Sequence, residues 1–158
     1  MSAPLDPGLL ELLRERSGLS IDLEGRFLHR GEPITHARTL EVLWRSLERQ
    51  PDGRYLVRVG RESGYVQLED APYVVRGAAR AGGGFLLHLS DGTAEPLAPD
   101  ALAVDHEGVL HTRVKGGHRA RCSRAAQVAL GLALEEDPGA PSGFSLVVGG
   151  RRHPVGKE

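Results

Sequence analysis

Residues 19–29 read L-S-I-D-L-E-G-R-F-L-H, and a version of the same stretch returns at residues 102–113 as L-A-V-D-H-E-G-V-L-H-T-R. Asp22, Glu24 and Gly25 each recur 83 positions later, as Asp105, Glu107 and Gly108. In both stretches a short strand candidate leads into a turn whose glycine is free to adopt positive φ. One unit used twice predicts an internal duplication.

A helix and two strands are predicted to follow the first stretch. Leu40, Leu43, Trp44 and Leu47 recur at i, i+3, i+4 and i+7, which predicts a helix from Thr35 with this face in the core. Strands are predicted at 55–59 and 65–69. Ahead of the duplicated stretch, Asp6-Pro7 predicts the start of a leading helix and Gly18 its end.

Asp70-Ala71-Pro72 marks the predicted boundary between two lobes, residues 1–70 with the leading helix and residues 71–158. The second lobe is predicted to open with a hairpin of residues 73–76 and 85–89. Its copy of the unit continues with a helix over 118–136 and strands at 144–148 and near 153–155. The expected fold class is α+β: a duplicated β-β-α-β unit forming two small antiparallel sheets, each packed by a helix.

Composition narrows the function classes. The chain has 158 residues, of which 40% are apolar, and a formal net charge of -1. That charge argues against a protein that coats extended nucleic acid or lies on an anionic membrane. The single cysteine excludes an internal disulfide framework, and no stretch resembles an export signal or a membrane span. We therefore expect a cytoplasmic protein with no membrane partner and no cofactor.

Four segments, taken in order, resemble the successive motifs of the bacterial family Domain of Unknown Function 1285. These segments are I-D-L-E-G-R-F-L-H-R-G-E-P-I (21–34), D-G-R-Y-L-V (52–57), V-Q-L-E-D-A-P-Y (66–73) and L-H-T-R-V-K-G-G-H-R-A-R (110–121). The closing V-V-G-G (147–150) is similar to the family's last motif. The resemblance implies an α+β fold with an internal duplication and a second lobe that is pleckstrin-homology-like. It also implies a nucleotide-like ligand between the lobes and a role in signal transduction.

The basic stretch after the second Asp-x-Glu-Gly turn is the strongest candidate site. A Gly-Gly break before a predicted helix would leave free N–H groups for an anion. Basic residues at a helix start are disfavoured unless an anion or an acidic side chain lies beside them. An arginine-rich solvated face is the alternative. The candidate residues are Arg113, Lys115, Gly116, Gly117, His118, Arg119 and Arg121, with an acidic cluster of Glu62, Glu69 and Asp70 to pair with them or contact the ligand.

Other chemistries have weaker signals. His29 and His36 repeat their spacing in His111 and His118, but zinc sites usually need tighter local pairs. Cys122 lies in an alanine-rich run, which favours a buried thiol over a nucleophile. We expect a non-enzymatic ligand-binding or regulatory protein for an anionic small molecule, and a homodimer is compatible with the sequence. A hydrolase or metal-dependent enzyme using the histidines or Cys122, and a protein-interaction module without a small ligand, remain the alternatives.

Overall fold

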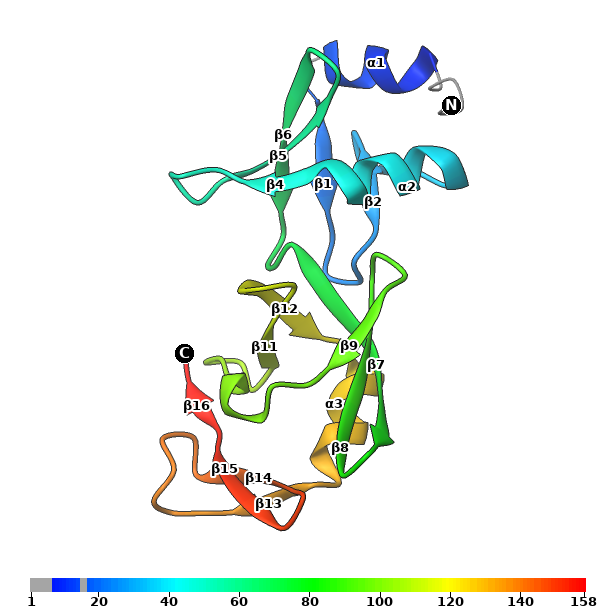
Figure 1. Ribbon diagram of the computed structural model, residues 1–158. Coiled ribbons are helices and arrows are strands. Elements are labelled where there is room, and N and C mark those ends of the chain that lie inside the picture. The colour runs from blue at the N-terminus through cyan, green and yellow to red at the C-terminus, as the bar shows by residue number, and fades with distance from the viewer. Residues whose placement is uncertain (1–6, 15–16) are drawn as a thin grey trace. The chain divides into compact units, whose positions relative to one another are not determined.

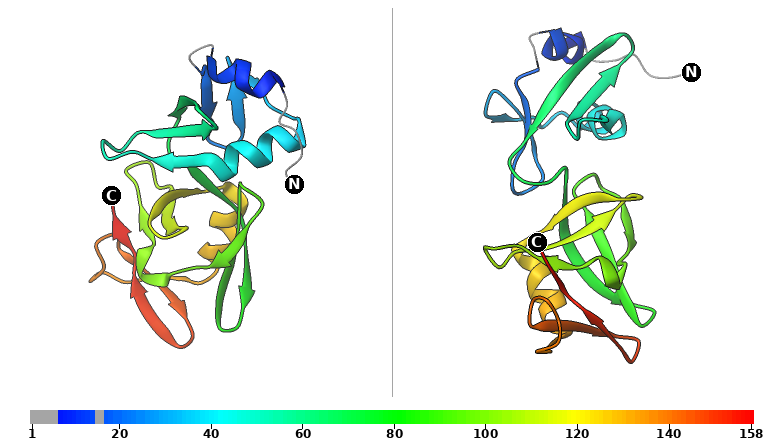
Figure 2. Two further views of the ribbon diagram at one scale, coloured as in Figure 1. Left: turned by 45° about the horizontal axis from the view of Figure 1, so that its top comes forward. Right: turned by 90° about the vertical axis from the view of Figure 1, so that its left-hand side faces the viewer.

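The computed structural model describes residues 7–14 and 17–158, and the chain divides into two compact units, Met1–Asp70 and Ala71–Glu158. Each unit combines helices with β-sheet (Figure 1 and Figure 2), so the predicted α+β class is confirmed. No helix among the described residues is long and apolar enough to cross a membrane.

The N-terminal unit is built on one six-stranded sheet in the order β3-β2-β1-β6-β5-β4. Neighbouring strands are antiparallel except β1 and β6, which run parallel. The sheet is therefore mixed, because one parallel pair is added to the expected antiparallel ones. The elements are α1 (Pro7–Arg14), β1 (Leu19–Ile21), β2 (Phe27–His29), β3 (Glu32–Pro33), α2 (Ala37–Ser46), β4 (Leu47–Arg49), β5 (Tyr55–Val59) and β6 (Glu62–Leu68).

The core of this unit lies between the sheet and α2. The α2 helix begins after His36, not at Thr35, because the His36 Nδ1 accepts a hydrogen bond from the Thr39 N–H at 3.2 Å. Leu43 is fully buried, whereas Trp44 is only partly buried against the core. The Trp44 ring meets the Phe27 ring edge-on, with the centroids 4.6 Å apart.

The leading helix packs on the same unit. Leu9 and Leu13 of α1 are buried in the core, and the helix contacts β6. A Cβ added to Gly64 of β6 would lie 2.8 Å from the Ser17 Cβ. The chain after α1 therefore requires glycine at this position. The predicted cap at Asp6 lies outside the described residues.

The C-terminal unit contains a seven-stranded sheet in the order β16-β10-β11-β12-β7-β8-β9 and a separate three-stranded sheet, β13-β14-β15. The first sheet holds two parallel pairs, β10 with β16 and β12 with β7. The elements are β7 (Tyr73–Ala81), β8 (Gly84–Leu89), β9 (Ala94–Pro96), a 3-10 turn (Pro99–Ala101), β10 (Ala103–Val104), β11 (Leu110–Val114), β12 (His118–Cys122), α3 (Arg124–Gly131), β13 (Leu134–Glu136), β14 (Phe144–Val148), β15 (Arg151–Pro154) and β16 (Gly156–Lys157).

The two units contain a repeat with the same order of elements, but the repeat is longer than the predicted β-β-α-β unit. In each unit three strands, a helix and three further strands follow one another, and the last strand returns to pair in parallel with the first. The last strand is β6 in the first repeat. In the second repeat it is interrupted at Val155 and divided into β15 and β16, so that one sheet becomes two. Strands β7 to β9 are an addition outside the repeat.

The helix predicted over 118–136 is wrong at both ends. Residues 118–122 form β12, in which Ala120 and Cys122 face the core with a period of two. The α3 helix starts only after Ser123, whose Oγ accepts a hydrogen bond from the Ala126 N–H at 3.1 Å. It packs on β7 and β12.

Candidate functional site

The structure places every residue of the predicted basic site on one hairpin, β11–β12. Gly116 and Gly117 form its turn, with φ of 83° and 130°. No helix starts at this turn, so the helix N-terminus that would have supplied free N–H groups is not there. The side chains of Arg113 and Arg119 lie opposite each other, because these two residues are cross-strand partners.

Two charges of this hairpin have acidic partners within the C-terminal unit. The Arg119 guanidinium binds the Glu158 carboxylate with two hydrogen bonds, of 2.7 and 3.2 Å. The hydrogen bond from Arg119 lowers the pKa of Glu158 below its ordinary value. The Lys115 Nζ lies 2.7 Å from an Asp91 carboxylate oxygen. The hairpin is therefore partly neutralised by its own unit, as the alternative of a charged surface predicts.

The predicted acidic cluster is not one cluster. Glu62 begins β6 and Glu69 follows its last residue, so the two lie roughly 20 Å apart at about 3.3 Å per residue. The Glu69 Oε2 accepts a hydrogen bond from the Leu23 N–H at 3.0 Å, which ties it to the first Asp-x-Glu-Gly turn. Asp70, the third member of the prediction, follows Glu69 directly.

The cysteine and the histidines that were candidates for enzymatic chemistry lie in places where they stabilise the fold. Burial raises the pKa of the Cys122 thiol to about 12, so the nucleophilic thiolate is not populated near neutral pH. His36 caps α2, and His111 is fully buried with its Nδ1 3.7 Å from both Asp105 and Glu158. Within residues 7–14 and 17–158, no three His, Cys, Asp or Glu side chains group as metal ligands.

The repeated Asp-x-Glu-Gly turns have the same geometry in both units. The Asp22 Oδ1 accepts hydrogen bonds from the N–H groups of Glu24 and Arg26, and the Asp105 Oδ1 does the same for Glu107 and Val109. Burial raises the pKa of each aspartate, but these hydrogen bonds outweigh it and the net pKa is lowered. The motif that identified the duplication is thus a turn built on a carboxylate.

An open cleft of about 530 Å³ lies in the C-terminal unit beside α3, within the 300–1,000 Å³ range of small-molecule sites. We call it the α3 cleft. Its apolar lining comes from β11, β13, β14 and the segment before β16, as Leu110, Leu134, Phe144 and Val155. Its polar lining includes Asp105, Gln127 and Lys157.

The α3 cleft opens where the two repeats differ in side-chain size. Helices α2 and α3 correspond residue by residue when they are aligned at their caps, His36 and Ser123. The fully buried Leu43 then matches the fully buried Leu130, Trp44 matches Gly131, and Leu47 matches Leu134 as the first residue of the following strand. On the sheet, Phe27 matches Leu110. The Phe27–Trp44 pair of the first repeat thus has only a leucine and a glycine as its counterpart.

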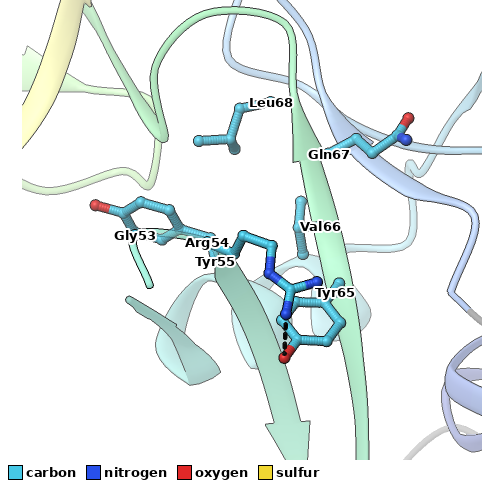
Figure 3. A pocket seen from close by; sticks show the side chains of 7 residues that line it. All are labelled: Gly53, Arg54, Tyr55, Tyr65, Val66, Gln67 and Leu68. Carbon is cyan, nitrogen blue, oxygen red and sulfur yellow. Dashed lines mark hydrogen bonds between the residues drawn. The ribbon is translucent and has the colours of Figure 1, made fainter. Parts of the chain in front are cut away.

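The N-terminal unit has a related cleft of about 570 Å³. Four of its lining residues correspond to lining residues of the α3 cleft, each 89 positions later in the sequence. The pairs are Gly53 with Ser142, Tyr55 with Phe144, Val66 with Val155 and Leu68 with Lys157. In Figure 3 the Arg54 guanidinium lies against the Tyr65 ring, with its Cζ 4.0 Å from the ring centroid. The Arg54 side chain also donates hydrogen bonds to the Tyr65 hydroxyl and to Asp52, so its charge is already partnered.

Sequence reasoning missed both clefts. Nothing in the order of residues marks Phe144, Val155 or Lys157 as neighbours of α3. The duplication becomes informative once the caps are known, because aligning the helices at His36 and Ser123 sets a glycine against the chain's single tryptophan.

No protein-family model matches the chain. No curated protein matches it either. Two solved structures do. One is a DUF1285 family protein from Silicibacter pomeroyi DSS-3, with a TM-score of 0.69 and 20% identity over 87% of this chain and 78% of that one. The other is a DUF1285 family protein from Shewanella baltica OS155, with a TM-score of 0.57 and 19% identity over 70% of this chain and 87% of that one. The chain therefore has the fold of DUF1285 family proteins.

Proposed function

We propose that this chain is a non-catalytic ligand-binding protein and that its ligand occupies the α3 cleft. One observation carries the proposal: a cleft of about 530 Å³ with an apolar floor reaches α3 at Gly131, where the other repeat carries an aromatic pair. Ligand sites are typically concave, mostly apolar and provided with few polar groups. The buried Cys122 thiol gives no support to a hydrolase, because its pKa is raised to about 12.

The proposal is tested by blocking the cleft with the side chain that the first repeat carries. A Cβ at Gly131 would meet no atom within 4 Å, so the site accepts a side chain. We expect wild-type protein to bind the fluorescent probe 8-anilinonaphthalene-1-sulfonate saturably at one site. Gly131→Trp should abolish this binding, whereas the control Gly131→Ala should retain it. Equal binding by wild type and by folded Gly131→Trp would contradict the assignment.

A nucleotide-like anion at the β11–β12 hairpin is the second candidate. Arg113 is exposed and directly opposite Arg119, and two like charges in that position repel each other unless an anion lies between them. Because Glu158 already binds Arg119, only Arg113 would contribute a new contact. ATP at low salt should then raise the melting temperature of wild type but not of Arg113→Ala. No shift in wild type would exclude this candidate.

A further inference from the structure

We infer that the α3 cleft takes an amphiphilic anion, a small molecule whose alkyl or aryl body lies on the apolar floor and whose carboxylate or phosphate end lies at Lys157. This inference rests on the proposed function of the cleft and adds the chemical class of its ligand. The ligand class follows from which lining side chains are not already engaged in hydrogen bonds or ion pairs within the protein.

The floor of the cleft is apolar. Leu110 and Val155 are buried in the unit, while Leu134 is partly buried and Phe144 is 44% exposed. The exposed ring of Phe144 offers surface that a ligand would remove from water. Covering apolar surface is favourable in proportion to its area, so an alkyl or aryl body suits this floor.

Most polar groups of the lining are engaged within the protein. The Gln127 Oε1 accepts from the Leu110 N–H and its Nε2 donates to the Gly108 carbonyl, each at 3.0 Å. The Asp105 Oδ1 accepts from two N–H groups of its own turn, and its Oδ2 lies 3.7 Å from His111. A ligand with polar groups along its body would therefore lose hydrogen bonds to water without replacing them.

Lys157 is the exception among the lining side chains. Its ammonium group makes no hydrogen bond or ion pair with residues 7–14 or 17–158, and the residue is exposed. The His106 ring also belongs to the lining, and its Nε2 lies 3.5 Å from the Glu107 carboxylate. In the first repeat the position of Lys157 is held by Leu68. The second repeat thus combines an open apolar floor with a free cation.

The test measures the binding of octanoate, decanoate and decanol by calorimetry, at concentrations below those at which micelles form. Decanoate should bind more tightly than octanoate, by up to about fourfold for each added methylene. Lys157→Gln should weaken decanoate binding roughly two- to fivefold, the range of exposed ion pairs, and leave decanol binding unchanged. Arg151→Gln is the matched control, since it removes one exposed charge that is not part of the lining.

The outcomes separate this inference from the proposed function. If decanol and decanoate bind alike and Lys157→Gln changes neither, the anionic class is wrong while the apolar cleft remains a site. If none of the three compounds binds wild type, both the ligand class and the cleft fail. If the acids bind but Gly131→Trp binds them equally, they occupy another place, and the inference is overturned.

Discussion

Gly131→Trp should stabilise the protein, because it recreates in the second repeat the packing that Trp44 provides in the first. A tryptophan side chain covers 150–250 Å² when buried, which corresponds to roughly 4–6 kcal/mol at full burial. Trp44 itself remains partly exposed, so about half of that value applies. Fixing the side chain costs about 1 kcal/mol, and removing a glycine from a helix returns about 0.5 kcal/mol.

The expected net effect is an increase of about 1.5–2.5 kcal/mol in the free energy of unfolding. Urea titrations of wild type, Gly131→Ala and Gly131→Trp, followed by circular dichroism, measure it directly. The alanine control separates the helix effect from the packing effect. The emission of the new indole, recorded in a Trp44→Phe background, gives its environment. A destabilised variant, or an indole with the emission of a fully solvated ring, would refute the correspondence between Gly131 and Trp44.

Three other changes follow from the packing and the charges. Phe27→Ala should lower the free energy of unfolding in urea titrations by about 3–5 kcal/mol, because the ring is only 1% exposed and contacts Trp44; a loss under 1 kcal/mol would contradict this core. Gly64→Ala should cost about 1–3 kcal/mol in the same assay, since its Cβ would lie 2.8 Å from Ser17, and an unchanged midpoint would argue against that approach. The pKa of Glu158 is lowered, so its pairing with Arg119 contributes stability that is present above the ordinary value of 4.5 and is lost as the pH falls below it. Arg119→Ala should therefore flatten the dependence of the free energy of unfolding on pH below 4.5. An unaltered dependence would show that the pair contributes nothing.

The elements that the sequence predicted well are those with a strong local signal. The two Asp-x-Glu-Gly turns and the strands at Tyr55–Val59 and Phe144–Val148 occur as expected. The helical face containing Leu43 also occurs, although α2 ends at Ser46 and the predicted Leu47 begins β4. Their signals are an apolar period, a carboxylate with a glycine three residues later, and β-branched runs. Short strands such as β3 and β13 have no such signal, because their conformation is set by the strands they pair with.

The anion site was predicted at the start of a helix at His118, and no helix starts there. Residues Arg119 to Cys122 alternate between polar and apolar, which is a strand signal, but the Gly-Gly pair before His118 is also compatible with a helix start. Lys115, Gly116 and Gly117 all have positive φ and form a hairpin turn instead. The caps His36 and Ser123 are 87 positions apart, whereas the repeated turns are 83 positions apart, so the offset of the turns does not locate the start of α3.

Parallel pairing of the first and last strands sets the order in which each repeat can fold during synthesis. Leu19 cannot meet its partner Val66 until the whole first repeat has been made, and Ala103 waits in the same way for Gly156. At translation rates of roughly 5–20 residues per second, β1 and β2 exist for several seconds as a hairpin with one unpaired apolar edge. An emerging chain therefore passes twice through an interval in which it can pair wrongly or associate with another chain. Each interval ends when β6 or β16 has been synthesised and pairs with the exposed edge.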